Sequence, residues 1–152
     1  MKTILNPQDK AEILTRLQNL RPESKGLWGT MSPGQALCHL NDELQFILGA
    51  KTGATEPPFF IKHFVKNMLL RGMSIPKGKA KAHPGLAQEF NGTPPKDFET
   101  DRTSLIENFE AIAAKPENST WYPNPLFGKM SRKQHARMTY VHFDHHLKQF
   151  GA

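Results

Sequence analysis

Apolar residues recur at a spacing of three or four along four separate stretches of the chain, and each stretch ends near a proline or a glycine. This spacing places side chains on one face of an α-helix, whereas a half-buried strand alternates at every second residue. No stretch shows convincing strand alternation. The sequence therefore predicts an all-α fold. The clearest helical face is the C-terminal one, formed by Ala136, Tyr140, Phe143, Leu147 and Phe150.

Helix-start signals precede these stretches. Asn6 is a capping residue followed by Pro7 at the first helical position, and Ser32-Pro33-Gly34-Gln35 is a capping box. A second capping box pairs Ser131 with Gln134. These signals predict helices over about residues 7–20, 33–48, 100–114 and 132–150.

Residues 51–99 have a different texture, because they are rich in proline, glycine and lysine. They contain one apolar run, PPFFIKHFVKNMLLRGM, which predicts a short helix started by Pro57 or Pro58. Too few apolar residues remain for a second core. We therefore expect one domain over residues 1–152, an antiparallel four-helix bundle with a long crossover that contains the additional short helix.

Composition limits the function. A chain of 152 residues buries a core without disulfides, and the single cysteine, Cys38, excludes both an intramolecular disulfide and a cysteine-rich zinc finger. The absence of a signal peptide or an apolar span predicts a cytoplasmic protein that is not bound to a membrane. The net charge of +6 permits nucleic-acid binding. However, the run of Lys77, Lys79 and Lys81 lacks interleaved aromatic residues, which disfavours a nucleic-acid role.

The seven histidines are the most informative polar residues, and three of them fall in the last eleven positions. On a helix, His142 and His146 share a strip at the edge of the apolar face, one turn apart. His145 points away from that face and is expected to face water. His135 lies on the same strip two turns earlier, where we expect a surface residue, with lining of a pocket entrance as the alternative.

The second helix has a matching polar edge. His39 lies beside its apolar face, and Glu43 follows one turn later on the same side. A bundle brings such edges together, so His39 can approach the other two histidines and form an open three-histidine metal site. The ordinary alternatives are hydrogen-bonded edge histidines and a solvated Glu43. Cys38 lies about 100° from His39 around the helix, so both side chains cannot easily face one ion. We therefore expect Cys38 to be a small buried apolar residue.

Several aromatic residues lead into or flank these helices. Trp28 and Trp121-Tyr122 are expected to pack over the bundle end, with pocket lining as a second possibility. Phe46 is expected at an exposed edge, and with the Pro-Pro-Phe-Phe run it either forms a homodimer face or covers the core. His63 and His83 have no partner at a helical spacing and receive no role.

The segments WGTMSPGQALCHLNDEL and VHFDHHLKQFG together resemble the DinB-like superfamily of helical bundles. They are most similar to an uncharacterised branch that shares three short signatures. These are Trp28-Gly29, Phe127-Gly128 and Gln149-Phe150-Gly151.

The resemblance implies a bundle that binds a divalent metal through His39, His142 and His146. It also implies thiol-dependent chemistry. At an open metal site, a low-molecular-weight thiol would act as the nucleophile on a small electrophile. Glu43 would hold either the second N–H of a ligating imidazole or a metal-bound water. Zinc is the expected metal, with nickel, copper or ferrous iron as alternatives. The alternative function is a non-enzymatic metal-binding or stress-related protein.

Overall fold

The computed structural model describes residues 1–52, 58–78 and 92–152, and within these ranges the fold is all-α as predicted. No strand occurs in the described residues; the pair Asn124 and Gly128 forms an isolated bridge. The helices are α1 (Pro7–Asn19), α2 (Pro33–Leu48), α3 (Lys66–Leu70), α4 (Phe98–Ala114) and α5 (Arg132–Gln149), with a π-helical turn, η1 (Ile61–Val65), leading into α3.

The predicted helix starts are confirmed. The Asn6 side chain accepts from the backbone N–H groups of Gln8 and Asp9, and both capping boxes form as expected. The start of α4 was placed two residues too late, because Asp97 caps this helix by accepting from the Thr100 N–H. The short apolar helix predicted in the crossover is also present, as η1 and α3.

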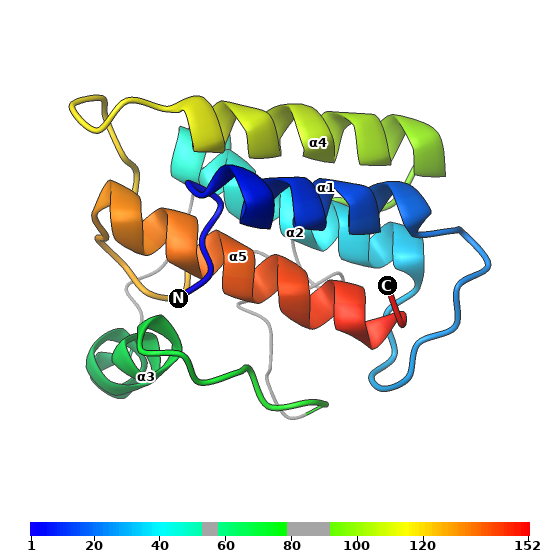
Figure 1. Cartoon of the computed structure of the whole chain (residues 1–152), viewed down its shortest axis with the longest axis horizontal. Coiled ribbons are helices and arrows are strands. Elements are labelled where there is room, and N and C mark those ends of the chain that lie inside the picture. The colour runs from blue at the N-terminus through cyan, green and yellow to red at the C-terminus, as the bar shows by residue number, and fades with distance from the viewer. Residues whose placement is uncertain (53–57, 79–91) are drawn as a thin grey trace.

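The four long helices lie side by side, and α3 lies outside them, against α5 (Figure 1). Helices α1 and α5 run in one direction, and α2 and α4 run in the opposite direction. Neighbouring helices α2 and α4 are therefore parallel, so the expectation of an antiparallel bundle is wrong for this pair. The long connection over residues 49–97 explains this, because it returns the chain to the end at which α2 began.

The core fills the space between α1, α2, α4 and α5, and the apolar face predicted for α5 is buried in it. Phe109 of α4 packs on Phe143 of α5 with ring centroids 5.0 Å apart. The other fully buried members include Ile13, Leu17, Leu37, Leu44, Ile47, Leu105 and Ile112. Phe46 was expected at an exposed edge, but it is only 4% exposed.

A second, smaller apolar cluster joins α3 to the outer side of α5. Its buried members are Leu69, Phe127, Met138 and Val141. Among the described residues, no helix has both the length and the apolar character required to cross a lipid bilayer.

The end of α2 depends on a glycine. Gly49 adopts φ +82, a left-handed conformation, and a Cβ atom at this position would lie 2.4 Å from the Tyr122 ring. Gly151 has a similar φ of +72 but has no atom within 4 Å of a Cβ. The two glycines therefore separate backbone strain from steric overlap.

We predict that Gly49→Ala destabilises the protein by about 1 kcal/mol or more beyond Gly151→Ala, because only the former adds overlap to the left-handed backbone cost of about 1–2 kcal/mol. Urea unfolding of both variants measures this difference. Tyr122→Ala should remove the extra cost of Gly49→Ala. Equal destabilisation by the two alanines would contradict the prediction.

Candidate metal centre

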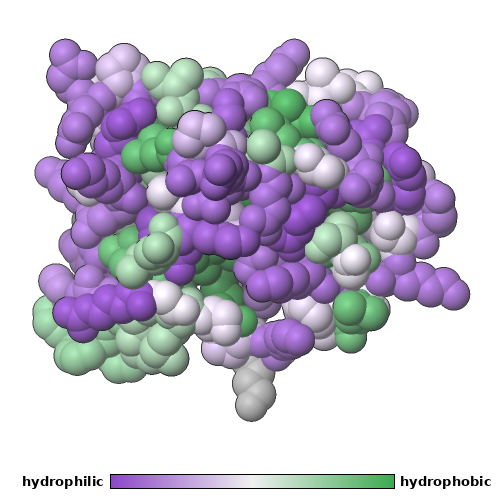
Figure 2. Space-filling view, viewed as in Figure 1, coloured by the Kyte–Doolittle hydropathy of each residue, from purple (hydrophilic) through white to green (hydrophobic). Residues whose placement is uncertain are grey.

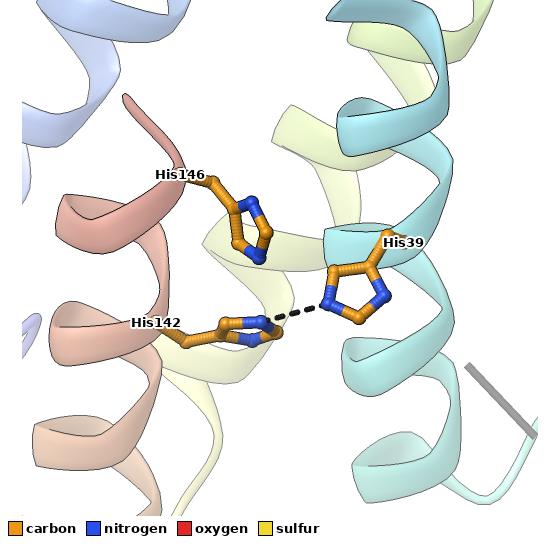
Figure 3. Close-up of side chains that lie close together, drawn as sticks. All are labelled: His39, His142 and His146. Carbon is orange, nitrogen blue, oxygen red and sulfur yellow. Dashed lines mark hydrogen bonds between the residues drawn. The ribbon is translucent and has the colours of Figure 1, made fainter. Parts of the chain in front are cut away.

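His39 of α2 and His142 and His146 of α5 converge between the two helices, as the helical positions predicted (Figure 3). One nitrogen from each ring lies within 4.8 Å of the other two, and the ring centroids are 4.8–4.9 Å apart. The Nε2 atoms of His39 and His142 are 2.9 Å apart. His39 and His146 are buried, and His142 is half-buried.

The orientation of His142 is set by a buried carboxylate. Glu43 is 3% exposed, and one of its oxygens is in hydrogen-bond contact with Nδ1 of His142. Its other oxygen accepts from the Asn124 side-chain amide at 2.6 Å. Asn124 is itself held because its Oδ1 accepts from the backbone N–H groups of Leu126 and Phe127. Glu43 is therefore buried against the His142 ring, and the alternative of a solvated Glu43 is wrong.

His146 is oriented by a second, separate contact. The Gln149 amide nitrogen donates to the Trp28 carbonyl oxygen at 2.8 Å, so its Oε1 atom faces Nδ1 of His146 at 2.9 Å. Gly29 makes this possible, because a Cβ atom there would lie 2.7 Å from the Gln149 amide nitrogen. The Trp28 loop therefore positions a histidine through its backbone.

These contacts determine which ring nitrogens are available. A carboxylate and an amide oxygen are acceptors only, so Nδ1 of His142 and Nδ1 of His146 carry their protons. In the neutral rings, Nε2 of His142 and Nε2 of His146 are therefore unprotonated, which is the form that binds a metal. The Nε2 of His142 lies within hydrogen-bond distance of Nε2 of His39.

The nitrogen separation suits a common ion. Two nitrogens bound at 2.0–2.1 Å lie about 3 Å apart at a right angle and about 3.4 Å apart at the tetrahedral angle. The 2.9 Å between His39 and His142 lies close to this range. The three histidines can therefore hold one metal ion after small ring rotations, and the residues present fit such a group.

The electrostatics of the site favour a neutral His146 ring and a charged Glu43 carboxylate. Burial and the neighbouring rings of His142, His39 and His145 hold the pKa of His146 well below its usual range. For Glu43, burial works to raise the pKa, but the charge and hydrogen bond of His142 outweigh it, and the pKa lies below its usual range. Glu43 is therefore ionised at neutral pH.

Two other histidines of α5 differ from expectation. His135 was expected at the surface but is fully buried, with its ring stacked on Trp121 at 5.4 Å, because the 121–128 loop folds over the start of α5. Its burial lowers the pKa to about 4. His145 was expected to face water but is half-buried between Trp28 and His146, and burial lowers its pKa to about 4 as well.

The remaining candidates lie away from the three histidines or outside the described residues. Cys38 is buried as expected. Trp121 packs on the core, and Tyr122 is 46% exposed. His63 contacts the Phe59 ring. Lys77 lies over the Trp28 ring. His83, Lys79 and Lys81 lie outside the described residues.

Sequence reasoning missed the roles of Asn124 and Gln149. The signal for Gln149 was present, because it belongs to the Gln-Phe-Gly signature, but its distance from Trp28 in sequence hid the contact. The Phe127-Gly128 signature also makes a contact that the sequence does not reveal. The Phe127 N–H donates to Oδ1 of Asn124, and the backbones of Asn124 and Gly128 exchange two hydrogen bonds of 2.9 Å.

A separate cleft of about 660 Å³ lies between α1, α5 and residues 72–75. Its lining includes Arg16, Arg137, Tyr140 and His145. None of His39, His142 and His146 lines it, so it is separate from the candidate metal site.

The fold and the site together define an all-α protein with a three-histidine cluster that can hold a metal ion. The chain belongs to the family described as "protein of unknown function (DUF1569)", which matches residues 2–152. No curated protein and no solved structure matches the chain.

The orienting contacts predict that Glu43→Gln and Gln149→Leu each weaken zinc binding about 10–100-fold, because the imidazoles lose the partners that hold their tautomers. Titration with zinc against a competing chelator measures the affinity. Glu107→Gln, which alters an exposed carboxylate of α4, is the matched control and should bind zinc like the unaltered protein. Unchanged affinity in both variants would contradict the assigned roles.

Cys38 provides a prediction about reactivity. Burial, aided by the nearby carboxylate of Asp101, raises the pKa of Cys38 to about 12, so the thiol stays protonated at pH 8. We predict that a thiol-reactive disulfide reagent leaves the folded protein unlabelled at pH 8. The same reagent should label one thiol per chain in guanidinium. Rapid labelling of the folded protein would show that Cys38 is accessible.

Proposed function

We propose that the protein binds one divalent metal ion through Nε2 of His39, His142 and His146, and that it is a thiol-dependent metalloenzyme acting on a small electrophile. The observation that carries the proposal is the convergence of one ring nitrogen from each of the three histidines, all within 4.8 Å of one another. The Nδ1 protons of two of these rings are held by Glu43 and Gln149. The sequence resemblance to DinB-like bundles supports the same ligand set.

The donor set supports zinc. Three neutral nitrogens bind zinc, nickel, copper and ferrous iron, and zinc is the abundant member that needs no redox partner. Three protein ligands also leave coordination positions open, which is typical of catalytic sites and unlike closed structural sites. A bound divalent ion would supply Lewis acidity that lowers the pKa of a small thiol at an open position.

The chain's own residues prepare the site for such chemistry. Glu43 keeps the proton on Nδ1 of His142 and places a buried negative charge behind that ring. This charge makes Nε2 of His142 a stronger metal ligand. Gln149 does the same for His146 without adding charge. Cys38 is not the nucleophile in this scheme, because its thiol is buried and its pKa is about 12. The thiol must therefore come from a small molecule.

Metal analysis tests the ligand assignment. The protein, purified without a histidine tag, is expected to contain or take up about one zinc per chain. His39→Ala and His142→Ala should each lose most of this zinc, because two nitrogens cannot replace three. The quantity is measured by mass spectrometry of the metal and by calorimetric titration.

His63→Ala is the matched control, since His63 is exposed and lies on η1. This variant should bind zinc normally. Stoichiometric zinc in both His39→Ala and His142→Ala would remove the proposal.

A second measurement separates an enzyme from a passive metal-binding protein. The zinc-loaded protein is incubated with a panel of low-molecular-weight thiols and a chromogenic electrophile. We expect turnover that disappears in His142→Ala. Background rates with every thiol, together with full zinc binding, would contradict the enzymatic part and leave the metal site intact.

A further inference from the structure

The helical element over residues 59–70 carries large apolar side chains on its outer side. Phe59, Phe60, Phe64 and Met68 are 71%, 60%, 54% and 43% exposed, and we name these four residues the outer patch. Figure 2 shows hydrophobic surface gathered at the lower left, where Figure 1 places α3. Exposed apolar residues grouped in this way usually mark an interaction surface.

The outer patch is not required for the packing of this element. Its inner side already packs on α5, where Leu69 is buried and Ile61 and Val65 are partly buried against the smaller apolar cluster. The helix is therefore apolar on both sides, although only one side has a partner in the described structure. Exposed apolar side chains on the second side do not contribute to this packing, which indicates that they contact a partner.

The charge of the protein is concentrated in the same part of the chain. No acidic residue occurs between Glu56 and Glu89, whereas six of the 20 Lys and Arg residues lie there. The remaining chain has 14 basic residues and 14 acidic residues, so the whole formal charge of +6 belongs to this stretch. Lys62, Lys66 and Arg71 are its members closest in sequence to the outer patch.

We propose that the outer patch docks on an anionic lipid bilayer, with its apolar side chains inserted at the interface and the exposed Arg71 near the headgroups. A short surface element that joins exposed aromatic residues to basic ones is typical of peripheral membrane attachment. This inference is independent of the metal site. It differs from the sequence-based expectation of no membrane contact, and the experiment below decides between the two.

Two other partners fit the observations less well. The Phe60 and Phe64 rings stack with centroids 5.3 Å apart, and the Phe59 and His63 rings have centroids 4.3 Å apart. Part of the aromatic surface is therefore already in contact and is less available for stacking nucleic-acid bases. A second copy of the chain would bring one basic stretch against another, which is unfavourable. An anionic lipid surface matches both the exposed apolar side chains and the positive charge of this stretch.

Vesicle co-sedimentation of the full chain tests the proposal. We expect binding to phosphatidylcholine vesicles that contain roughly a third phosphatidylglycerol, and much weaker binding to phosphatidylcholine alone. Binding should fall as salt rises, because the charges are screened. Phe60→Ser with Phe64→Ser should reduce the affinity about tenfold or more, and Arg71→Glu should reduce it further.

The matched control is Leu27→Ser, which removes an exposed apolar residue (70% exposed) outside the patch and should leave binding unchanged. Circular dichroism and thermal unfolding confirm that the variants fold. Absence of binding to the anionic vesicles, or equal binding by the Phe60/Phe64 double variant, would overturn the proposal. So would a dimer in light scattering, or tight binding of a single-stranded oligonucleotide, that depends on these phenylalanines while vesicles are not bound.

Discussion

The contact between Glu43 and His142 is the interaction on which the candidate site depends most. A carboxylate buried to this degree is costly unless its oxygens are paired, and here both oxygens have partners. One partner is the imidazole and the other is Asn124, whose own position is set by the backbone of the 124–128 turn. The loop before α5, the middle of α2 and the middle of α5 are therefore joined by one buried polar network. Loss of any member leaves another buried group without its partner.

The geometry of the site depends on loop residues as well as on the helices that carry the histidines. Gln149 near the C-terminus reaches the backbone of Trp28, and a glycine next to that tryptophan leaves room for the amide. The three short signatures that supported the resemblance to DinB-like bundles thus have a physical role. Two of them, Trp28-Gly29 and Gln149, orient His146, and the third, Phe127-Gly128, stabilises the turn behind Glu43. The imidazoles are arranged before any ion arrives, which reduces the ordering cost of binding one.

Helix α5 serves two different surfaces. One side carries His142 and His146 toward α2, and another side carries Met138 and Val141 toward α3. The element that carries the outer patch therefore packs on α5, the helix that also carries two of the three histidines. The outer patch and the three histidines share no residue, so the two proposed properties can be tested separately.

The sequence by itself determined the helices and the choice of the three histidines. Both follow from local rules, since caps, prolines and a 3.6-residue period depend only on near neighbours in the chain. Tertiary structure decided what distant segments do. It buried His135 under Trp121, enclosed His145 between Trp28 and His146, made α2 and α4 parallel, and gave Glu43 its partner Asn124. These features required the packing of loops onto helices, and helical periodicity carries no information about where a loop returns.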